Sequence, residues 1–314
     1  MTRSRAAVAF GTATAAALGA LTWGVLVERT RFTVRHEVLP ILEPGSRSLT
    51  ILHLSDLHMA PWQRKKQDFV RSLVRYEPDL IVDTGDNLGH EDGLVGIRRA
   101  LEPFRGIPGV FAHGSNDYHG PMLKNPLAYF GGPSGVRPRS PDLDVAALDD
   151  FFTGLGWLDL NNTARALETR GHRIELFGTG DAHLGWDRLD ALPGEIERLR
   201  EEVEWDFESD ITVRLGVTHA PYRRVLDALT TQGADLILAG HTHGGQVRIP
   251  GLPALVTNCD IPRTQAQGLS VWKGARRSAL LNVSAGLGTS IYAPVRFACP
   301  PEAVVLTLVP VGYP

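Results

Sequence analysis

Residues 49–58 read LTILHLSDLH, an apolar run followed at once by a carboxylate and an imidazole two positions apart. The run Leu49–Leu54 has the length and composition of a buried β-strand. In an extended backbone, residues two apart point to the same side, so Asp56 and His58 are placed to bind one ion. This stretch therefore predicts a strand that ends in a metal-binding loop.

The rest of the chain repeats this alternation of short apolar runs and amphipathic stretches. Further strands are expected at 80–83, 109–112, 173–177, 211–217, 235–238, 279–283 and 303–309, and helices at 64–75, 94–101, 145–152, 195–203 and 221–229. Such alternation is typical of an α/β domain, which we expect to occupy residues 47–314. The proline-rich stretch 119–144 is expected to be a surface insertion.

The N-terminus differs from the rest of the chain because residues 6–27 carry no charge. A helix of that length, at ~1.5 Å per residue, would span a hydrocarbon core of ~30 Å. We therefore expect residues 1–28 to be a hydrophobic helix that anchors the protein in the cell membrane by a single pass. The side of the membrane stays undecided, since basic residues flank both ends. The alternative is a cleaved signal segment and a secreted protein. Residues 29–46 then form an exposed linker.

Composition limits the partners of the protein. The formal charge of −3 over 314 residues offers no general attraction to nucleic acid. The two cysteines are too few for a disulfide framework and have no CxxC spacing. We expect a monomer that does not bind nucleic acid.

Residues with metal-ligand chemistry follow four further expected strands. These groups are Asp83-Thr84-Gly85-Asp86-Asn87, Gly114-Ser115-Asn116-Asp117, Thr218-His219-Ala220-Pro221 and Gly240-His241-Thr242-His243-Gly244. Open α/β folds place their sites at such strand ends. One such group alone is more often a capped turn, and Asp181-Ala182-His183 is a second Asp-x-His copy to which no metal role is assigned. Five groups in order predict a metal centre.

These ordered motifs resemble those of the calcineurin-like metallophosphoesterases, over about residues 47–310, and are most similar to the membrane-attached bacterial branch. The resemblance implies an α/β fold in which two mixed β-sheets form a four-layer αββα sandwich. It also implies two metal ions that share Asp86. One ion would be held by Asp56, His58, Asp86 and His243, and the other by Asp86, an Asn of the third motif, His219 and His241.

The donor set agrees with that implication on chemical grounds. Carboxylates mixed with imidazoles suit divalent or trivalent Mn, Fe, Zn or Co better than Ca or Mg. Two ions ~3.5–4 Å apart can share a hydroxide that attacks a phosphoryl group. The expected reaction is hydrolysis of a phosphodiester, phosphomonoester or pyrophosphate bond.

The third motif departs from the family pattern, which reads Gly-Asn-His-Asp or Gly-Asn-His-Glu. Aligned without a gap, Ser115 takes the place of the Asn ligand and Asn116 that of the His. A shift of one residue makes Asn116 the ligand, which we favour because its amide oxygen is a better donor than a hydroxyl. Asp117 then stands at the His position, where two cations would keep it ionised and a poor acid. His119, on the loop side, is the hypothetical replacement acid, and His113 is the other nearby imidazole.

Two functions therefore stay open. The first is a metal-dependent phosphoesterase, for which a lipid-linked substrate near the bilayer is one hypothesis. The second is a metal-binding phosphoester sensor or binding module whose catalysis is impaired by the missing imidazole.

Overall fold

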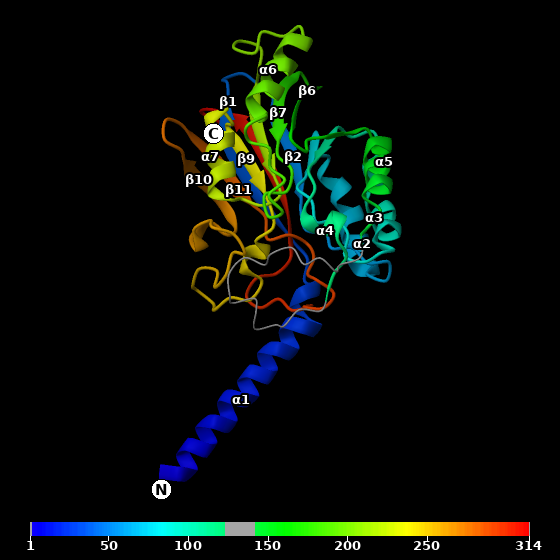
Figure 1. The fold of residues 1–314 in the computed structure, drawn as a ribbon. Helices are drawn as coiled ribbons and strands as arrows, with labels where there is room; N and C mark the ends of the chain where they lie inside the picture. Colours follow the sequence, from blue (N-terminus) through cyan, green and yellow to red (C-terminus); the bar gives the residue numbers. More distant parts are fainter. Residues whose placement is uncertain (1, 123–141, 314) are drawn as a thin grey trace.

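The computed structural model describes residues 2–122 and 142–313. Its centre is a pair of six-stranded β-sheets (Figure 1). In order, the first sheet holds β1 (Thr33–Leu42), β12 (Glu302–Pro310), β2 (Leu49–Leu54), β3 (Leu80–Asp83), β4 (Gly109–Phe111) and β5 (Trp157–Asp159). The second holds β10 (Gly268–Lys273), β11 (Ser278–Val283), β9 (Leu236–Ala239), β8 (Val213–Thr218), β7 (His172–Gly178) and β6 (Thr163–Thr169).

Both sheets are mixed. In the first sheet, β2, β3, β4 and β5 run parallel, and β12 pairs antiparallel with β2. In the second, β7, β8, β9 and β11 run parallel, while β6 and β10 are antiparallel edge strands. The carboxyl ends of the parallel strands in each sheet therefore meet at one edge, where the polar motifs emerge.

The helices lie outside the sheets. Their bounds are α1 (Thr2–Leu26), α2 (Arg64–Ser72), α3 (Gly93–Leu101), α4 (Ser115–Tyr118), α5 (Val145–Leu155), α6 (Leu192–Glu202) and α7 (Arg223–Thr231). Short 3-10 turns form at η1 (Glu28–Thr30), η2 (Leu73–Tyr76), η3 (Glu102–Phe104), η5 (His243–Gly245) and η6 (Arg263–Gln265).

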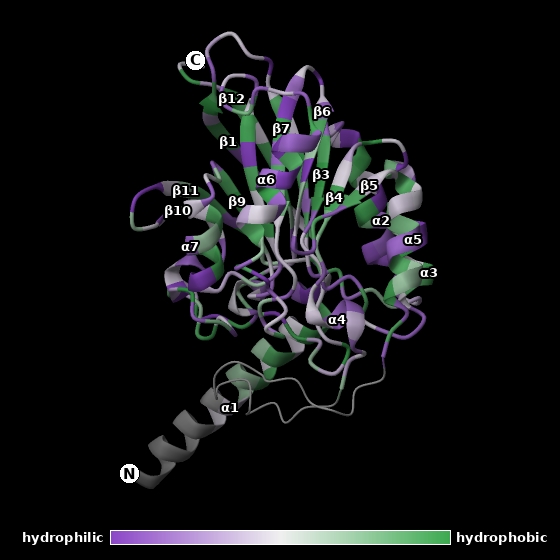
Figure 2. Ribbon diagram, turned by 45° about the horizontal axis from the view of Figure 1, so that its top comes forward, coloured by the Kyte–Doolittle hydropathy of each residue, from purple (hydrophilic) through white to green (hydrophobic). Residues whose placement is uncertain are grey.

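Three buried clusters define the layers. The central cluster packs Ile51 and Val82 of the first sheet against Leu215 and Leu236 of the second. A second cluster joins the first sheet to α2, α3 and α5, and a third joins the second sheet to α6 and α7. Figure 2 shows hydrophobic residues concentrated on the strands. The predicted α/β class with two mixed sheets is confirmed.

The segment predicted as an exposed linker is a strand, and that prediction is wrong for residues 33–42. β1 pairs in parallel with β12, and it buries Leu39 and Leu42 against the sheet. Pro40 is compatible with this position because β1 is an edge strand, where a missing N–H is tolerated. Pro40 therefore lies in the edge strand of the sheet, and Pro44 and Gly45 form the turn after it.

α1 projects from the body of the protein, and its C-terminal end contacts the segment before β12 (Figure 1). The backbone N–H of Arg296 donates to the carbonyl oxygen of Gly24 at 3.2 Å. Buried Glu28 accepts hydrogen bonds from the backbone N–H of Cys299 and the indole N–H of Trp23, at 2.7 and 2.9 Å.

No helix within residues 2–122 and 142–313 combines the length and apolar character needed to cross a membrane. The predicted membrane-spanning anchor is therefore not supported. The predicted insertion at 119–144 lies largely outside the described residues.

Candidate metal centre

The predicted ligands come from both sheets and meet at the edge formed by the strand ends. Asp56 and His58 follow β2, Asp86 follows β3, and His243 follows β9. Ligand atoms from these four residues all lie within 4.8 Å of one another. Packing the two sheets face to face is what brings β9 opposite β2, although the two strands are nearly 200 residues apart in sequence.

The first ligand group converges on one point. The Nε2 atoms of His58 and His243 lie 3.2 Å apart. Nε2 of His58 is 3.5 Å from Oδ2 of Asp86, and Nε2 of His243 is 3.5 Å from Oδ1 of Asp56. Two imidazole nitrogens that face each other between two carboxylates are better explained as ligands of a transition metal ion than as hydrogen-bond partners of each other.

A second group gathers on the other side of Asp86. Nε2 of His219 lies 3.5 Å from Oδ1 of Asp86 and 3.2 Å from Nδ1 of His241. The amide of Asn116 lies against the same carboxylate, with Nδ2 2.6 Å from Oδ2. The carboxylate of Asp86 thus lies between the two groups, as the resemblance implied. The amide nitrogen of Asn116 contacts the oxygen of Asp86 that faces His58, so its role as a ligand of the second ion stays a prediction.

The charge states of the histidines suit metal binding. Burial lowers the pKa of His58 to about 4. Burial also lowers the pKa of His241 and His243 well below the ordinary value, assisted by cationic neighbours such as His219 and Arg296. These imidazoles are therefore neutral at pH 7, which is the form that binds metal.

The shared carboxylates need positive charge. Burial raises the pKa of Asp56 to about 6. Burial acts in the same direction on Asp86, but His219 and His58 outweigh it and hold the pKa of Asp86 far below its usual range. Burial lowers the pKa of His219, yet Asp86 and Asp56 raise it to about 9. A proton on His219 therefore partly balances the carboxylates, and a bound metal ion would take over that role.

Asp117, predicted as a catalytic residue, has a different place. Its buried carboxylate accepts four backbone hydrogen bonds: from Asp86 and Gly114 at 2.8 and 3.0 Å, and from Asn87 and Leu88 at 2.7 and 3.2 Å. Both oxygens are fully used in fixing the loop that presents Asp86. These contacts give Asp117 a positioning role, in line with the expectation that it is a poor acid, and its catalytic role stays a prediction.

The two histidines expected to compensate contact other carboxylates. Nδ1 of His119 lies 3.3 Å from Oδ1 of Asp142. Nε2 of His113 lies 2.6 Å from Oδ1 of Asp149. Burial lowers the pKa of His113, but Asp117 and Asp149 raise it to about 10, so it stays protonated at neutral pH and is a poor acid. The catalytic role of His119 stays a prediction.

Glycines allow the motifs to approach closely. A Cβ on Gly114 would lie 2.3 Å from Oδ1 of Asp86 and 2.7 Å from the ring of His219. A Cβ on Gly288 would lie 2.5 Å from the carbonyl oxygen of Leu57 and 2.7 Å from Cβ of His58. The glycine-rich stretch 284–290 therefore packs behind the first ligand group.

Two features of the site gave little signal in the sequence. Arg296 is fully buried, and its Nη2 lies 3.3 Å from Nδ1 of His243 and donates to the carbonyls of Ala285 and Gly288 at 2.7 Å. It thereby ties the glycine-rich stretch to a ligand. His183, from the second Asp-x-His copy, places its ring centroid 4.7 Å from that of His241.

Comparison with known proteins agrees with this geometry. The profile of the calcineurin-like phosphoesterase family matches residues 49–245, more than half of the chain. The chain therefore belongs to the calcineurin-like phosphoesterases.

Relatives of known sequence cover most of the chain. It is 26% identical to YpbG of Bacillus subtilis (strain 168) over 270 residues, covering 84% of this chain and 82% of that one. It is 27% identical over 281 residues to the phosphodiesterase YaeI of Escherichia coli (strain K12), covering 88% and 87%. Among solved structures, TT1561 of Thermus thermophilus aligns with a TM-score of 0.43 at 14% identity, over 77% of this chain and 91% of that one.

Proposed function

We propose that the protein is a dinuclear metal-dependent phosphoric ester hydrolase. The observation that carries this proposal is the pair of ligand groups that share Asp86, four of whose members bring ligand atoms within 4.8 Å of one another. Mn, Fe, Zn or Co would suit these donors and, when bound, would activate water and neutralise charge on the phosphoryl group.

The residues of the chain would hold and orient the reacting groups. Neutral His58, His241 and His243 and the two ionised carboxylates supply the donors, and Asp117 and Arg296 fix the loops that carry them. A phosphodiester is the favoured substrate class because YaeI, which shares 27% identity with this chain, is a phosphodiesterase. Phosphomonoesters and pyrophosphates stay in the proposal, as does a lipid-linked substrate.

Proton supply to the leaving group needs a residue outside the third motif. His183 is proposed for this role beside the earlier hypothesis of His119, because its ring lies next to His241 and its Nδ1 lies 3.1 Å from the hydroxyl of Tyr222. His119 instead lies against Asp142. Loss of a general acid costs ~10²–10⁴ in rate and matters most for poor leaving groups.

The proton donor is tested with two leaving groups. If His183 donates, His183→Ala slows an alkyl ester far more than a 4-nitrophenyl ester, whereas His119→Ala affects both alike or neither. Equal slowing of both esters by His183→Ala would exclude it as the donor.

The hydrolase proposal is tested with the full chain loaded with Mn. Turnover of bis(4-nitrophenyl) phosphate and 4-nitrophenyl phosphate is measured for wild type, for Asp86→Ala, and for Asp210→Asn as a control that removes one carboxylate paired with Arg173 on the surface. We expect Asp86→Ala to lose activity and bound metal by elemental analysis, and Asp210→Asn to keep both.

The rival function is a sensor or binding module that retains the metals. It is favoured by the absence of the third-motif imidazole. Wild-type protein that binds two metals per chain but turns over no faster than Asp86→Ala would establish the rival and reject the hydrolase.

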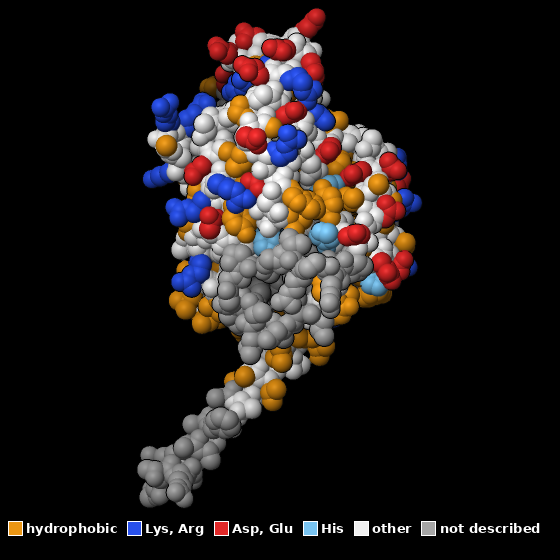
Figure 3. All heavy atoms as spheres, in the orientation of Figure 1, with side chains coloured by type: hydrophobic (Ala, Val, Ile, Leu, Met, Phe, Trp, Pro, Cys, Tyr) orange, Lys and Arg blue, Asp and Glu red, His pale blue; other side chains and the backbone are white. Residues whose placement is uncertain are grey.

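We further propose the membrane as a partner, through the end of the molecule that carries α1. Large apolar side chains are exposed there, with Trp62 at 59%, Ile249 at 51% and Tyr292 at 49%. Figure 3 shows hydrophobic side chains around the base of α1. Aromatic residues of this kind favour the bilayer interface. A place at the cell membrane and in the membrane-attached branch of the family belongs to this proposal, and a secreted form is the alternative.

Vesicle flotation tests this surface. We expect the full chain to float with vesicles and the variant Trp62→Ser/Ile249→Ser to float less, while Val271→Ser on β10, an equally exposed position, changes nothing. Equal behaviour of all three proteins would reject the membrane contact.

A further inference from the structure

A cavity of about 290 Å³ lies between the C-terminal end of α1 and the start of α2. Its lining includes Arg29, Trp62, Arg64, Lys65, Lys66 and Gly288. We call it the α1–α2 cavity. Nothing in the proposed hydrolysis uses this cavity, although four of these six residues are basic.

The walls of the cavity are joined to each other. Nζ of Lys65, on α2, donates to the hydroxyl of Thr30 on η1 at 3.3 Å. Glu28, next to Arg29, is held by Cys299 and Trp23. The segment after α1 is thus docked on the body of the protein, and the cavity is part of the folded domain.

The basic residues of the cavity have no acidic partner. No carboxylate of the described residues forms an ion pair with Arg29, Arg64, Lys65 or Lys66, and residues 123–141 contain no Asp or Glu. Asp68, on the same helix, pairs with Arg99 instead. Four neighbouring positive charges therefore repel one another unless an anion joins them.

Lys66 makes this imbalance strongest because its side chain is buried, with 5% of the residue exposed. Its ammonium donates to the carbonyl oxygens of Leu57 and His58 at 2.5 and 3.2 Å. Carbonyl dipoles orient the charge but do not neutralise it. Burial, with Arg296 and Arg29 nearby, lowers the pKa of Lys66 to about 7, and an anion in the cavity would favour its charged form.

The helix that contributes these residues adds to the positive potential. α2 begins at Arg64, and its N-cap residue, Gln63, makes no side-chain cap hydrogen bond. The backbone N–H groups of Arg64, Lys66 and Gln67 already donate to the carbonyls of Trp62 and Gln63, so this end favours an anion through the helix dipole. This feature supports the site that the cavity and the unpaired cations define.

The cavity lies directly behind the metal centre. Lys66 contacts the carbonyls of Leu57 and His58, and the N–H of Gly288 donates to the carbonyl of Asp56 at 2.6 Å. A group bound there would lie one backbone layer from the first ligand group.

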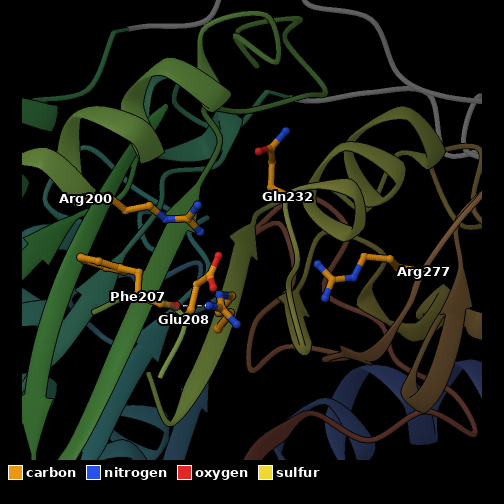
Figure 4. A pocket seen from close by; sticks show the side chains of 6 residues that line it. Arg200, Phe207, Glu208, Gln232 and Arg277 are labelled. Atoms are coloured by element: carbon orange, nitrogen blue, oxygen red, sulfur yellow. Dashed lines mark hydrogen bonds between the residues drawn. The ribbon is translucent and has the colours of Figure 1, made fainter. Parts of the chain in front are cut away.

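A second cavity, of about 370 Å³, is also rich in arginine but differs in charge (Figure 4). Arg200 and Arg214 both pair with the buried carboxylate of Glu175, at 2.8 Å. Glu208 also lines that cavity. Its positive charge is largely compensated, so it carries no comparable argument.

We propose that the α1–α2 cavity is a binding site for a phosphate group, free or as part of a lipid headgroup. Arg64 and Lys65 supply exposed cations, Arg29 supplies a half-buried one, and Lys66 supplies the buried amine. The volume accommodates a phosphate with part of the organic group attached to it, and the ring of Trp62 forms an apolar wall. This site is separate from the metal ligands and does not depend on the proposed hydrolysis.

Trp62 provides a local readout that does not need catalysis. Its fluorescence is titrated with inorganic phosphate, with phosphatidylcholine vesicles, and with vesicles of phosphatidylglycerol in phosphatidylcholine. Trp62→Phe identifies the part of the signal that comes from this residue. The variant Arg64→Ala/Lys65→Ala removes two cations of the cavity. Lys273→Ala/Arg276→Ala removes the same charge from β10 and the turn after it, away from α1 (Figure 1).

We expect phosphate or the anionic vesicles to change the Trp62 signal of wild type and of the control variant. The apparent affinity of Arg64→Ala/Lys65→Ala should be at least about tenfold weaker. A response to phosphate assigns the site to a free anion, and a response to phosphatidylglycerol vesicles alone assigns it to a headgroup. No response of Trp62 to either anion, or equal weakening in both double variants, would overturn the proposal.

Discussion

Replacing Asp117 by Asn separates the two roles that this residue can have. The change keeps the size of the side chain and converts one carboxylate oxygen into an amide that can only donate. In the structure each carboxylate oxygen accepts hydrogen bonds from two backbone N–H groups. The amide nitrogen of Asn cannot accept, so two of these N–H groups would lose their acceptor. Two of the four hydrogen bonds that join Asp117 to Gly114 and to the loop that carries Asp86 would be lost.

The expected cost follows from those four bonds. Leaving two buried N–H groups unsatisfied costs ~1–3 kcal/mol each, or roughly 2–6 kcal/mol of unfolding free energy. For a domain of this size, each kcal/mol lowers the melting temperature by roughly 2–4 °C. We therefore expect Asp117→Asn to melt on the order of 10 °C lower than wild type and to bind Mn more weakly.

Melting is followed by differential scanning calorimetry with and without Mn, alongside turnover of 4-nitrophenyl esters. Asp210→Asn, a surface change of the same kind, is the control and should melt within about 2 °C of wild type. A positioning residue lowers stability and metal affinity together. If Asp117→Asn kept the melting temperature and metal content of wild type but lost turnover, Asp117 would be a proton donor after all.

Three further predictions concern pH, Arg296 and β1. The pKa of His219 is raised to about 9, so the stabilisation from its proton is fully present below about pH 6.5 and is lost as the pH rises through 9. The difference in unfolding free energy between metal-free wild type and His219→Gln should therefore shrink over that pH range, as measured by urea titration. Arg296→Met should weaken Mn binding with little change in secondary structure, because it releases His243 and the glycine-rich stretch; unchanged affinity by calorimetry would contradict this. A chain that starts at residue 47 lacks β1 and exposes the edge of β12, so it should melt lower and aggregate more, by light scattering, than one that starts at residue 29.

The ligands of the site were predictable because their signal is local. Asp56, His58, Asp86, His219 and the His241-x-His243 pair each follow an apolar run within a few residues, and strand and ligand chemistry can be read from the same stretch. The parallel order of the strands then requires these stretches to meet at one edge. The sequence alone therefore reached both the fold class and the ligand residues that the structure gathers.

Long-range partners explain what the sequence did not reveal. β1 contains Pro40 and several polar residues, and it becomes a strand because β12, about 270 residues later, pairs with it. The hydroxyl of Thr33 also donates to the carbonyl oxygen of Pro301. The structural role of Asp117 could not be read from the sequence, because three of its four N–H partners lie about 30 residues earlier in the chain. Arg296 gave no motif at all, since its carbonyl partners belong to an otherwise ordinary turn.

The backbone of the ligands shows how these long-range contacts serve the site. Five of the eleven non-glycine residues with positive φ in the described chain are candidate ligands: Asp56, His58, Asp86, His241 and His243. Each such conformation costs about 1–2 kcal/mol, so the five together cost roughly 5–10 kcal/mol. The cost is offset by hydrogen bonds between one ligand loop and the next, such as the N–H of His58 to the carbonyl of Asp86 at 2.9 Å and the N–H of His241 to the carboxylate of Asp56.

These bonds connect protein groups from different ligand motifs, so each candidate ligand loop helps to hold the next one in its strained conformation. Asp117 and Arg296 also support these loops. Each is a buried charged side chain that fixes a loop whose backbone conformation is locally unfavourable. The site is therefore built by contacts from outside the ligand motifs, which is why the motifs predicted the ligands but not the residues that hold them in place.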